Sequence, residues 1–389
     1  MNHVLDTIRG FRRLPTAFPG QWLYLYAEEG VIYSEGQNRF AGLDAAGVSA
    51  YLAFEGGVSI GDLRRLNTEV SRGSAPDDGL EAIEALTHGV FPAEETPDEL
   101  PTPGLTGPGG RVSGASKTEI IEIGGIPLLL EYPSGQLEQL CRDYFKYCPA
   151  SDKPARCRLY AGRGEDGWAI YVNDRKLLSL ASEEQLGLGL MHAARTILYA
   201  EAEYDVAFHA AAVARGDRAV LLSAPRESGK STLSAFLVAR GFDLLTDEPA
   251  LLHLDRSAVS ALRVPISLKQ GSWPLLQLEY PQLADAPVHV RSDGSRVLLA
   301  HPAEDRRAEQ ERSLKHILFP KYQPSAVGQI QRLPPLRALE LLNNGGMLLG
   351  KNLGRTKFED FLELVCRVPA HEIRYSSLQE AWGLLPDLC

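Results

Sequence analysis

The pattern of apolar and polar positions changes several times along the 389-residue chain. Near its start, residues 22–26 and 30–33 are short apolar runs on either side of a turn, which predicts a β-hairpin. Helical spacing of apolar residues follows over 44–54, 60–70 and 80–89. We therefore expect a small α+β domain over residues 1–91.

A second region begins after residues 92–117, which are dense in Pro, Gly, Ser and Thr and are predicted to be a linker. Apolar runs at 119–123 and 126–130 flank Gly124-Gly125, a strong two-residue hairpin signal. Strands are expected at 158–160, 168–172 and 176–180, and a helix at 183–200. Residues 118–200 are thus predicted to form a sheet and helix leading into a core over 201–389, the two together making one domain over 118–389.

The core region opens with a predicted hairpin, 208–214 and 218–223, around Gly216-Asp217. No residues are left for a crossover helix, so the second strand runs antiparallel to the first. A helix with an apolar stripe follows and ends at Arg240-Gly241. The pattern predicts an α/β fold with a mixed sheet.

The segment between this strand and this helix has the features of a phosphate-binding loop. Gly229 allows close approach of the backbone to a phosphate, Lys230 supplies a cation, and the hydroxyl of Ser231 is a ligand for Mg²⁺. The predicted nucleotide-binding residues are Ala224, Pro225, Arg226, Glu227, Ser228, Gly229, Lys230, Ser231 and Thr232. An ordinary strand-to-helix turn containing Gly-Lys-Ser is the alternative.

Two residues depart from the usual loop pattern. Ala224 stands where that pattern has glycine, and alanine disfavours positive φ. Glu227 brings a carboxylate near the phosphates, and we expect it to point outward or to pair with Arg226.

An acidic pair, Asp247-Glu248, follows the apolar residues 244–245. At the carboxyl end of a strand near the loop, one carboxylate can hold Mg²⁺ and the other can accept a proton from an attacking hydroxyl. We assign Asp247 as general base and Glu248 as metal support, and the two roles could be exchanged. An ordinary polar strand end before Pro249 is the alternative.

Together, residues 208–213, 228–233 and 244–248 resemble the catalytic domain of HPr kinase/phosphorylase, and more closely the HPr-kinase-related kinase A proteins. Residues 38–44 are similar to a PqqD-type peptide-binding domain. The resemblance implies an HPr-kinase/PEP-carboxykinase-like P-loop domain after a winged-helix-like α+β domain. It also implies ATP and Mg²⁺ as cofactors, catalytic roles for His209, Lys230 and Asp247, and a homo-oligomer.

Two further residues have open assignments. His209 would donate a hydrogen bond near the γ-phosphate or hold the base in place, although a lone His in an apolar strand is more often structural. Lys269 would contact phosphate or the acceptor, or would simply be solvated. The glycine-rich segment of bifunctional HPr kinases is not recognisable between 255 and 300, so the resemblance does not extend to phosphorylase activity.

Composition narrows the possible partners. The formal net charge of −10 argues against nonspecific binding to nucleic acid and favours a protein or peptide partner. No apolar run approaches the roughly 18 residues of a membrane helix, so we expect a cytoplasmic protein that does not associate with membranes. The five cysteines lack C-x-x-C spacing and are expected to be reduced thiols, and Arg306-Arg307 is interpreted as a solvated charge run.

The leading hypothesis is a kinase that transfers the γ-phosphoryl group of ATP to a Ser or Thr hydroxyl of a small protein or peptide, HPr-like or modified, delivered by the first domain. Two alternatives remain. One is a nucleotide-binding regulatory or scaffold protein without turnover, and the other is a kinase for a small-molecule hydroxyl.

Overall fold

The computed structural model describes residues 7–8, 10–16, 19–55, 116–164, 167–225, 227–351 and 353–385. The predicted helices at 60–70 and 80–89 and most of the predicted linker lie outside the described residues. Ser116 and Lys117, assigned to that linker, instead begin strand β6. Within the described residues, no helix is both long and apolar enough to span a membrane.

The first sheet is an antiparallel meander with its strands in chain order. It confirms the predicted hairpin, in which Leu25 pairs with Gly30, but the sequence indicated only two of the five strands. Helix α1 (Ala45–Glu55) begins where the Asp44 carboxylate accepts a hydrogen bond of 2.7 Å from the Gly47 N–H. The strands are β1 (Thr7–Ile8), β2 (Phe11–Pro15), β3 (Gln21–Tyr26), β4 (Glu29–Ser34) and β5 (Arg39–Leu43).

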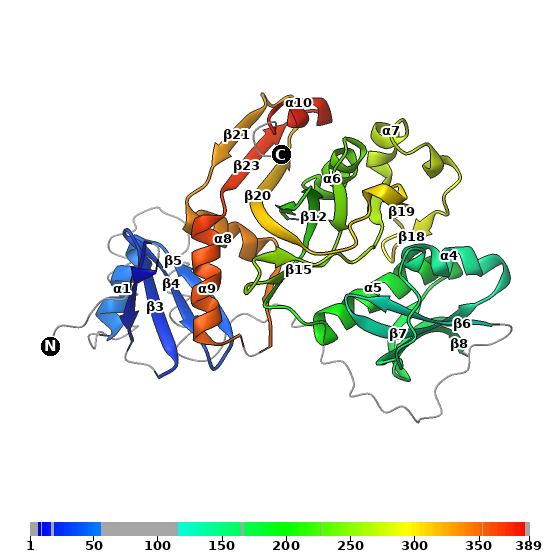
Figure 1. Cartoon of the computed structure of the whole chain (residues 1–389), viewed down its shortest axis with the longest axis horizontal. Helices are drawn as coiled ribbons and strands as arrows, with labels where there is room; N and C mark the ends of the chain where they lie inside the picture. The colour runs from blue at the N-terminus through cyan, green and yellow to red at the C-terminus, as the bar shows by residue number, and fades with distance from the viewer. Residues whose placement is uncertain are drawn as a thin grey trace.

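This sheet packs on helix α9 (Gly354–Arg367), close to the other end of the chain (Figure 1). The ring of Tyr33 stacks on Phe358 with centroids 4.1 Å apart, and the Tyr24 hydroxyl donates a hydrogen bond of 3.1 Å to Glu359. Phe358 is fully buried by these contacts. The two ends of the described chain therefore share one hydrophobic core.

The second sheet has the order β10-β9-β8-β7-β6, and helix α5 (Leu186–Glu201) packs against it. It confirms the hairpin at Gly124-Gly125 and the three later strands. It is separate from the sheet that precedes the predicted phosphate-binding loop. Its strands are β6 (Ser116–Ile123), β7 (Ile126–Pro133), β8 (Cys157–Gly164), β9 (Gly167–Val172) and β10 (Arg175–Leu180). Short helical segments lie beside it: η1 (Gly135–Leu137), α4 (Glu138–Arg142), η2 (Asp143–Phe145) and η3 (Glu183–Gln185).

The third and largest sheet is mixed, as predicted. Strand β13 pairs antiparallel with β12 and parallel with β20. The predicted strand 208–214 is divided at His209, because β11 pairs with β15 and β22 whereas β12 pairs with β13 and β14. Its strands are β11 (Val206–Phe208), β12 (Ala210–Arg215), β13 (Arg218–Ser223), β14 (Asp243–Thr246), β15 (Ala250–His253), β16 (Ala258–Val259), β20 (Arg312–Tyr322), β21 (Gln329–Arg332), β22 (Met347–Leu349) and β23 (Ala370–Tyr375).

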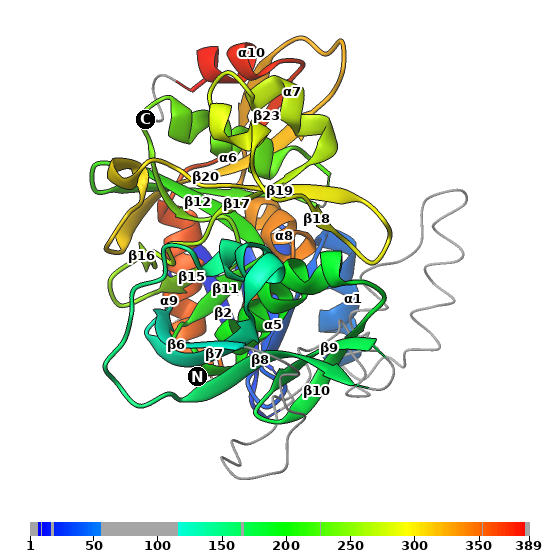
Figure 2. The same cartoon turned by 90° about the vertical axis from the view of Figure 1, so that its right-hand side faces the viewer.

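Helices cover both faces of this sheet, so β12 and β13 are apolar on both sides (Figure 2). Ala212 belongs to the same core as residues of α8 (Pro335–Asn344) and α9, whereas Val213 belongs to the core that includes residues of α6 (Lys230–Ala239) and α10 (Leu378–Gly383). The remaining elements are a small sheet of β17 (Ile266–Lys269), β18 (His289–Val290) and β19 (Arg296–Ala300), with α7 (Trp273–Leu276), η4 (Gln270–Ser272), η5 (Pro281–Ala284) and η6 (Glu304–Arg306).

Candidate nucleotide-binding site

Strand pairing brings three distant segments to one edge of the large sheet. Strands β13 and β14 both run antiparallel to β12, so their carboxyl ends lie beside its start. Ala210 at the start of β12 pairs with Ser223, the last residue before the loop. Ala212 pairs with Thr246, the last residue before the acidic pair. His209 comes directly before Ala210. The loop, the acidic pair and His209 therefore meet at this edge.

The loop closes around the start of α6. Gly229 has φ of 94°, and a Cβ there would lie 2.9 Å from the hydroxyl of Tyr375, so backbone conformation and space both require glycine. Helix α6 begins at Lys230, whose ammonium donates a hydrogen bond to the Ala224 carbonyl. The first N–H groups of the helix, including those of Ser231 and Thr232, have no acceptor within the helix and are available to an anion.

Ala224 does not have the conformation for which glycine would be needed. It is buried, and its φ is not positive. Positive φ occurs instead at Glu227, at 69°. Its side chain points outward, 78% exposed, and accepts a hydrogen bond of 2.9 Å from Lys269. Lys269, 47% exposed, is thus held in an ion pair at the surface. Arg226 lies outside the described residues.

The other loop residues are held by neighbouring elements. The Ser228 carbonyl accepts a hydrogen bond of 3.3 Å from the Tyr322 N–H at the end of β20. The buried Ser228 hydroxyl has no hydrogen-bond partner within the described chain. The Thr232 hydroxyl lies 2.6 Å from that of Ser272. Pro225 is exposed beside these residues.

Asp247 is buried beside the loop, with 6% of its surface exposed. One carboxylate oxygen accepts a hydrogen bond of 2.9 Å from the Ser267 N–H, while no described group makes a hydrogen bond of ordinary geometry to the other oxygen, Oδ1. Burial raises the pKa of Asp247, and this is partly offset by the charge of Arg195 and by the nearby Ser231 hydroxyl.

Glu248 is engaged through both oxygens. Oε1 lies 2.6 Å from Nδ1 of His209, and Oε2 lies 3.0 Å from the guanidinium of Arg195 on α5. Burial alone would raise the pKa of Glu248, but the charge of Arg195 and the hydrogen bond from His209 lower it to about 2. Glu248 is therefore held as a carboxylate, whereas Asp247 is the more easily protonated member of the pair.

Two parts of this site were missed by sequence reasoning. Arg195 lies on the helix predicted at 183–200, between buried apolar positions, and an arginine on that face was the only signal. The second part is the turn Gly345-Gly346 after α8. The Gly346 carbonyl accepts a hydrogen bond of 2.7 Å from the His209 N–H, and a Cβ on Gly345 would lie 2.7 Å from the Ser223 hydroxyl.

A divalent cation here would rely on few protein ligands. In the part of the chain that the structure describes, no group of three or more His, Cys, Asp and Glu side chains is arranged to hold a metal. Ser231 and the unpartnered Oδ1 of Asp247 suit Mg²⁺, which usually takes one or two protein oxygens and completes its shell with phosphate and water. The residues present therefore fit a phosphate-bound cation.

The cysteines agree with the expectation of reduced thiols. Cys141, Cys148 and Cys157 form no disulfide bond within the described residues, and Cys389 lies outside them. No protein-family model matches the chain, and no curated protein matches it either.

Proposed function

We propose that this protein is a P-loop kinase that transfers the γ-phosphoryl group of ATP to a Ser or Thr hydroxyl of a small protein or peptide. The observation that carries the proposal is the meeting, at one sheet edge, of the loop at 224–232 with Asp247, Glu248 and His209. The resemblance of the same segments to HPr-kinase-related proteins supports it.

The loop and the start of α6 would bind the phosphates. The free N–H groups of the first helical turn face the anion, and the Lys230 ammonium would leave the Ala224 carbonyl to contact the β- and γ-oxygens. Ser231 and Asp247 would hold Mg²⁺, which when bound supplies positive charge to the phosphates. Because Glu248 already uses both oxygens, we place Asp247 rather than Glu248 on the metal side, and neither carboxylate is then the general base.

His209 is then the candidate proton acceptor. Its Nδ1 is hydrogen-bonded to Glu248, so Nε2 is the nitrogen that can accept a proton. The side chain is 30% exposed, so a substrate can reach it. The acceptor oxygen forms a bond to the γ-phosphorus as the bond to the β,γ-bridging oxygen breaks, ADP leaves, and the hydroxyl proton goes to Nε2. Glu248 orients the ring and balances its positive charge, the part that a carboxylate takes beside a histidine base.

Transfer of label from γ-labelled ATP to candidate peptides and proteins tests this proposal. Lys230→Ala is expected to abolish transfer while leaving the melting temperature within a few degrees of the parent's, whereas Lys315→Ala, at an exposed lysine of β20, should retain it. Asp247→Asn is expected to lower both metal-dependent nucleotide binding and turnover, whereas His209→Gln should lower turnover alone. Full transfer by Lys230→Ala would refute the kinase assignment.

Two alternatives have different outcomes in the same assays. A regulatory nucleotide-binding protein would bind ATP in a Lys230-dependent way but move no label. The hydrogen bond from Lys230 to the Ala224 carbonyl favours the regulatory protein, because a lysine that keeps this bond when nucleotide is bound does not contact the γ-phosphate. A small-molecule kinase would consume ATP with a low-molecular-weight hydroxyl compound and show no preference for peptides.

A further inference from the structure

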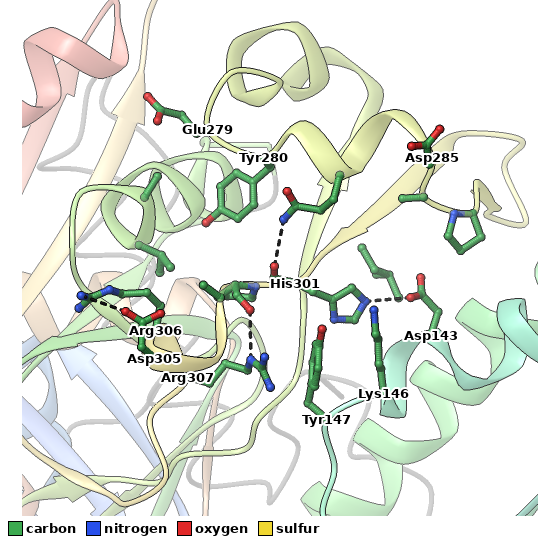
Figure 3. A pocket seen from close by; sticks show the side chains of 18 of the residues that line it. Asp143, Lys146, Tyr147, Glu279, Tyr280, Asp285, His301, Asp305, Arg306 and Arg307 are labelled. Atoms are coloured by element: carbon green, nitrogen blue, oxygen red, sulfur yellow. Dashed lines mark hydrogen bonds and ion pairs between the residues drawn. The ribbon is translucent and has the colours of Figure 1, made fainter.

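A cavity of about 930 Å³ lies where the second sheet's helical segments meet the core region (Figure 3). One wall comes from η2 and the residues after it, with Lys146 and Tyr147. The facing segments are the turn after α6, at Arg240, and the stretch that contains His301 and Arg307. None of the residues of the phosphate-binding loop lines this cavity.

Two cations share one aromatic ring on that wall. The Arg307 guanidinium lies 3.4 Å from the centroid of the Tyr147 ring, and the Lys146 ammonium lies 5.2 Å from it. The same ring and that of His301 form a T-shaped pair, with centroids 5.2 Å apart. Figure 3 shows these side chains close together on the cavity wall. This stacking corrects the expectation that Arg307 belongs to a solvated charge run.

Most of the acidic side chains near the cavity are paired with residues other than Lys146 and Arg307. Asp143 lies between Nε2 of His289 and Nε2 of His301, at 2.9 and 2.8 Å. Glu279 pairs with Arg240, and Asp305 pairs with Arg306. Asp285 lies on the other side of the cavity from Tyr147 (Figure 3). Within the described ranges, neither Lys146 nor Arg307 forms an ion pair with a carboxylate, so two like charges face the cavity without a counter-ion.

Arg307 is also held in a fixed orientation. Its Nε donates a hydrogen bond of 3.1 Å to the Pro302 carbonyl, and its backbone is bridged to Leu244 of β14. Nε and the face of the guanidinium are thereby used, which leaves the terminal N–H groups for a ligand. A planar guanidinium whose orientation is already fixed can bind two oxygens of a carboxylate or phosphate at once. Beside it, Nδ1 of His301 is buried and makes no hydrogen bond to any described group.

We propose that this cavity is a binding site for a small organic anion, whose carboxylate or phosphate group is bound by Arg307 and Lys146. The volume has room for a ligand larger than the anionic group itself. The proposal does not depend on kinase activity. The cavity and the phosphate-binding loop lie at opposite ends of α6, whose ten residues span about 15 Å.

Calorimetric titration of the full chain with succinate and with inorganic phosphate tests the site. The Lys230→Ala background weakens phosphate binding at the loop, and the Arg307 variant separates any binding that remains there from binding in the cavity. We expect saturable binding of at least one probe with a Kd of about 1 mM or tighter, weakened at least tenfold by Arg307→Ala. The matched control is Arg337→Ala, at a half-exposed arginine on α8, which should leave binding unchanged.

The probe that binds distinguishes a carboxylate site from a phosphate site. No saturable binding of either probe, or binding that survives Arg307→Ala, would overturn the proposal. If Arg307→Ala lowers the melting temperature by more than about 5 °C, Lys146→Ala takes its place, because Lys146 is exposed and its replacement is expected to leave the fold intact. Binding that is unchanged in Lys146→Ala then counts against the site.

Discussion

At the scale of single residues, Glu227 shows how the loop tolerates its unusual sequence. Its φ of 69° costs a non-glycine residue about 1 kcal/mol, while Ala224, the missing glycine of the usual pattern, carries no such cost. The carboxylate points away from the loop because Lys269 holds it there. Glu227, rather than Ala224, is therefore the residue that should limit nucleotide affinity.

Two substitutions of Glu227 should separate the effect of its charge on ATP affinity from the effect of its backbone strain on stability. Glu227→Gln is expected to tighten ATP binding about fivefold, by removing a negative charge and releasing Lys269. Glu227→Gly should do the same and also raise the unfolding free energy by about 1 kcal/mol. Ser325→Gly, at φ of 65° in an exposed turn, controls for the backbone effect and should not change ATP affinity. Equal ATP affinity in all three variants would contradict this account.

The lowered pKa of Glu248 leads us to expect that the stability of the fold depends on pH. Its pKa is about 2 in the folded chain against an ordinary value of 4.5, so folding favours the carboxylate. This contribution, about 3 kcal/mol, is present above pH 4.5 and is lost as the pH falls towards 2. The difference in unfolding free energy between the parent and Glu248→Gln should therefore shrink by about 2 kcal/mol between pH 6 and pH 3.

Denaturant titrations at several pH values measure this difference. Glu309→Gln, which removes a carboxylate that is 76% exposed, is the control and should show a small, nearly constant difference from the parent. A difference for Glu248→Gln that does not vary with pH would mean that Glu248 is not held as a carboxylate.

At the scale of elements, the turn after α8 packs against His209 and holds its position. Gly346 has φ of 92°, and a Cβ there would lie 3.0 Å from Cβ of His209. Gly346→Ala should therefore displace His209 from Glu248 and reduce phosphotransfer at least tenfold, in addition to a backbone cost of about 1 kcal/mol. Gly294→Ala has a similar φ of 80° with open space around it, so it should show the backbone cost alone. Similar turnover in both variants would exclude a role for this contact.

Sequence patterns found the elements whose signals are local. The hairpin at Gly216-Asp217, the loop and helix α6 follow from turn residues and apolar periodicity within about 30 positions. Arg195 and Gly346 reach the site through long-range strand pairing and helix packing, which a single sequence does not reveal. The division of the strand at His209 was missed for the same reason, because only the partners of β11 and β12 reveal it.

At the scale of the whole molecule, the first sheet and α9 depend on each other. Phe358 is buried between Tyr24, Tyr33 and Phe40. Deleting residues 1–110 to test peptide delivery would expose this face of α9, so loss of activity in such a truncation would not identify the substrate. Point substitutions in the full chain are the better experiment.

Phe358→Ala should measure how strongly the first sheet stabilises the rest. We expect a loss of about 3–5 kcal/mol in unfolding free energy, because a fully buried aromatic ring is replaced by a cavity. Leu278→Ala, at a side chain that is 89% exposed, should change stability by less than about 0.5 kcal/mol. Near-parent stability of Phe358→Ala would mean that the first sheet contributes little to the common core.

The contact between the first sheet and α9 also has a consequence for synthesis of the chain. Tyr24 and Glu359 are separated by 335 positions, so the apolar face of the first sheet is made long before its partner. At about 5–20 residues per second, the ribosome needs on the order of 20 to 70 seconds to reach α9. During that time the nascent sheet exposes aromatic side chains, and a chaperone that shields apolar surface should raise the yield of folded protein.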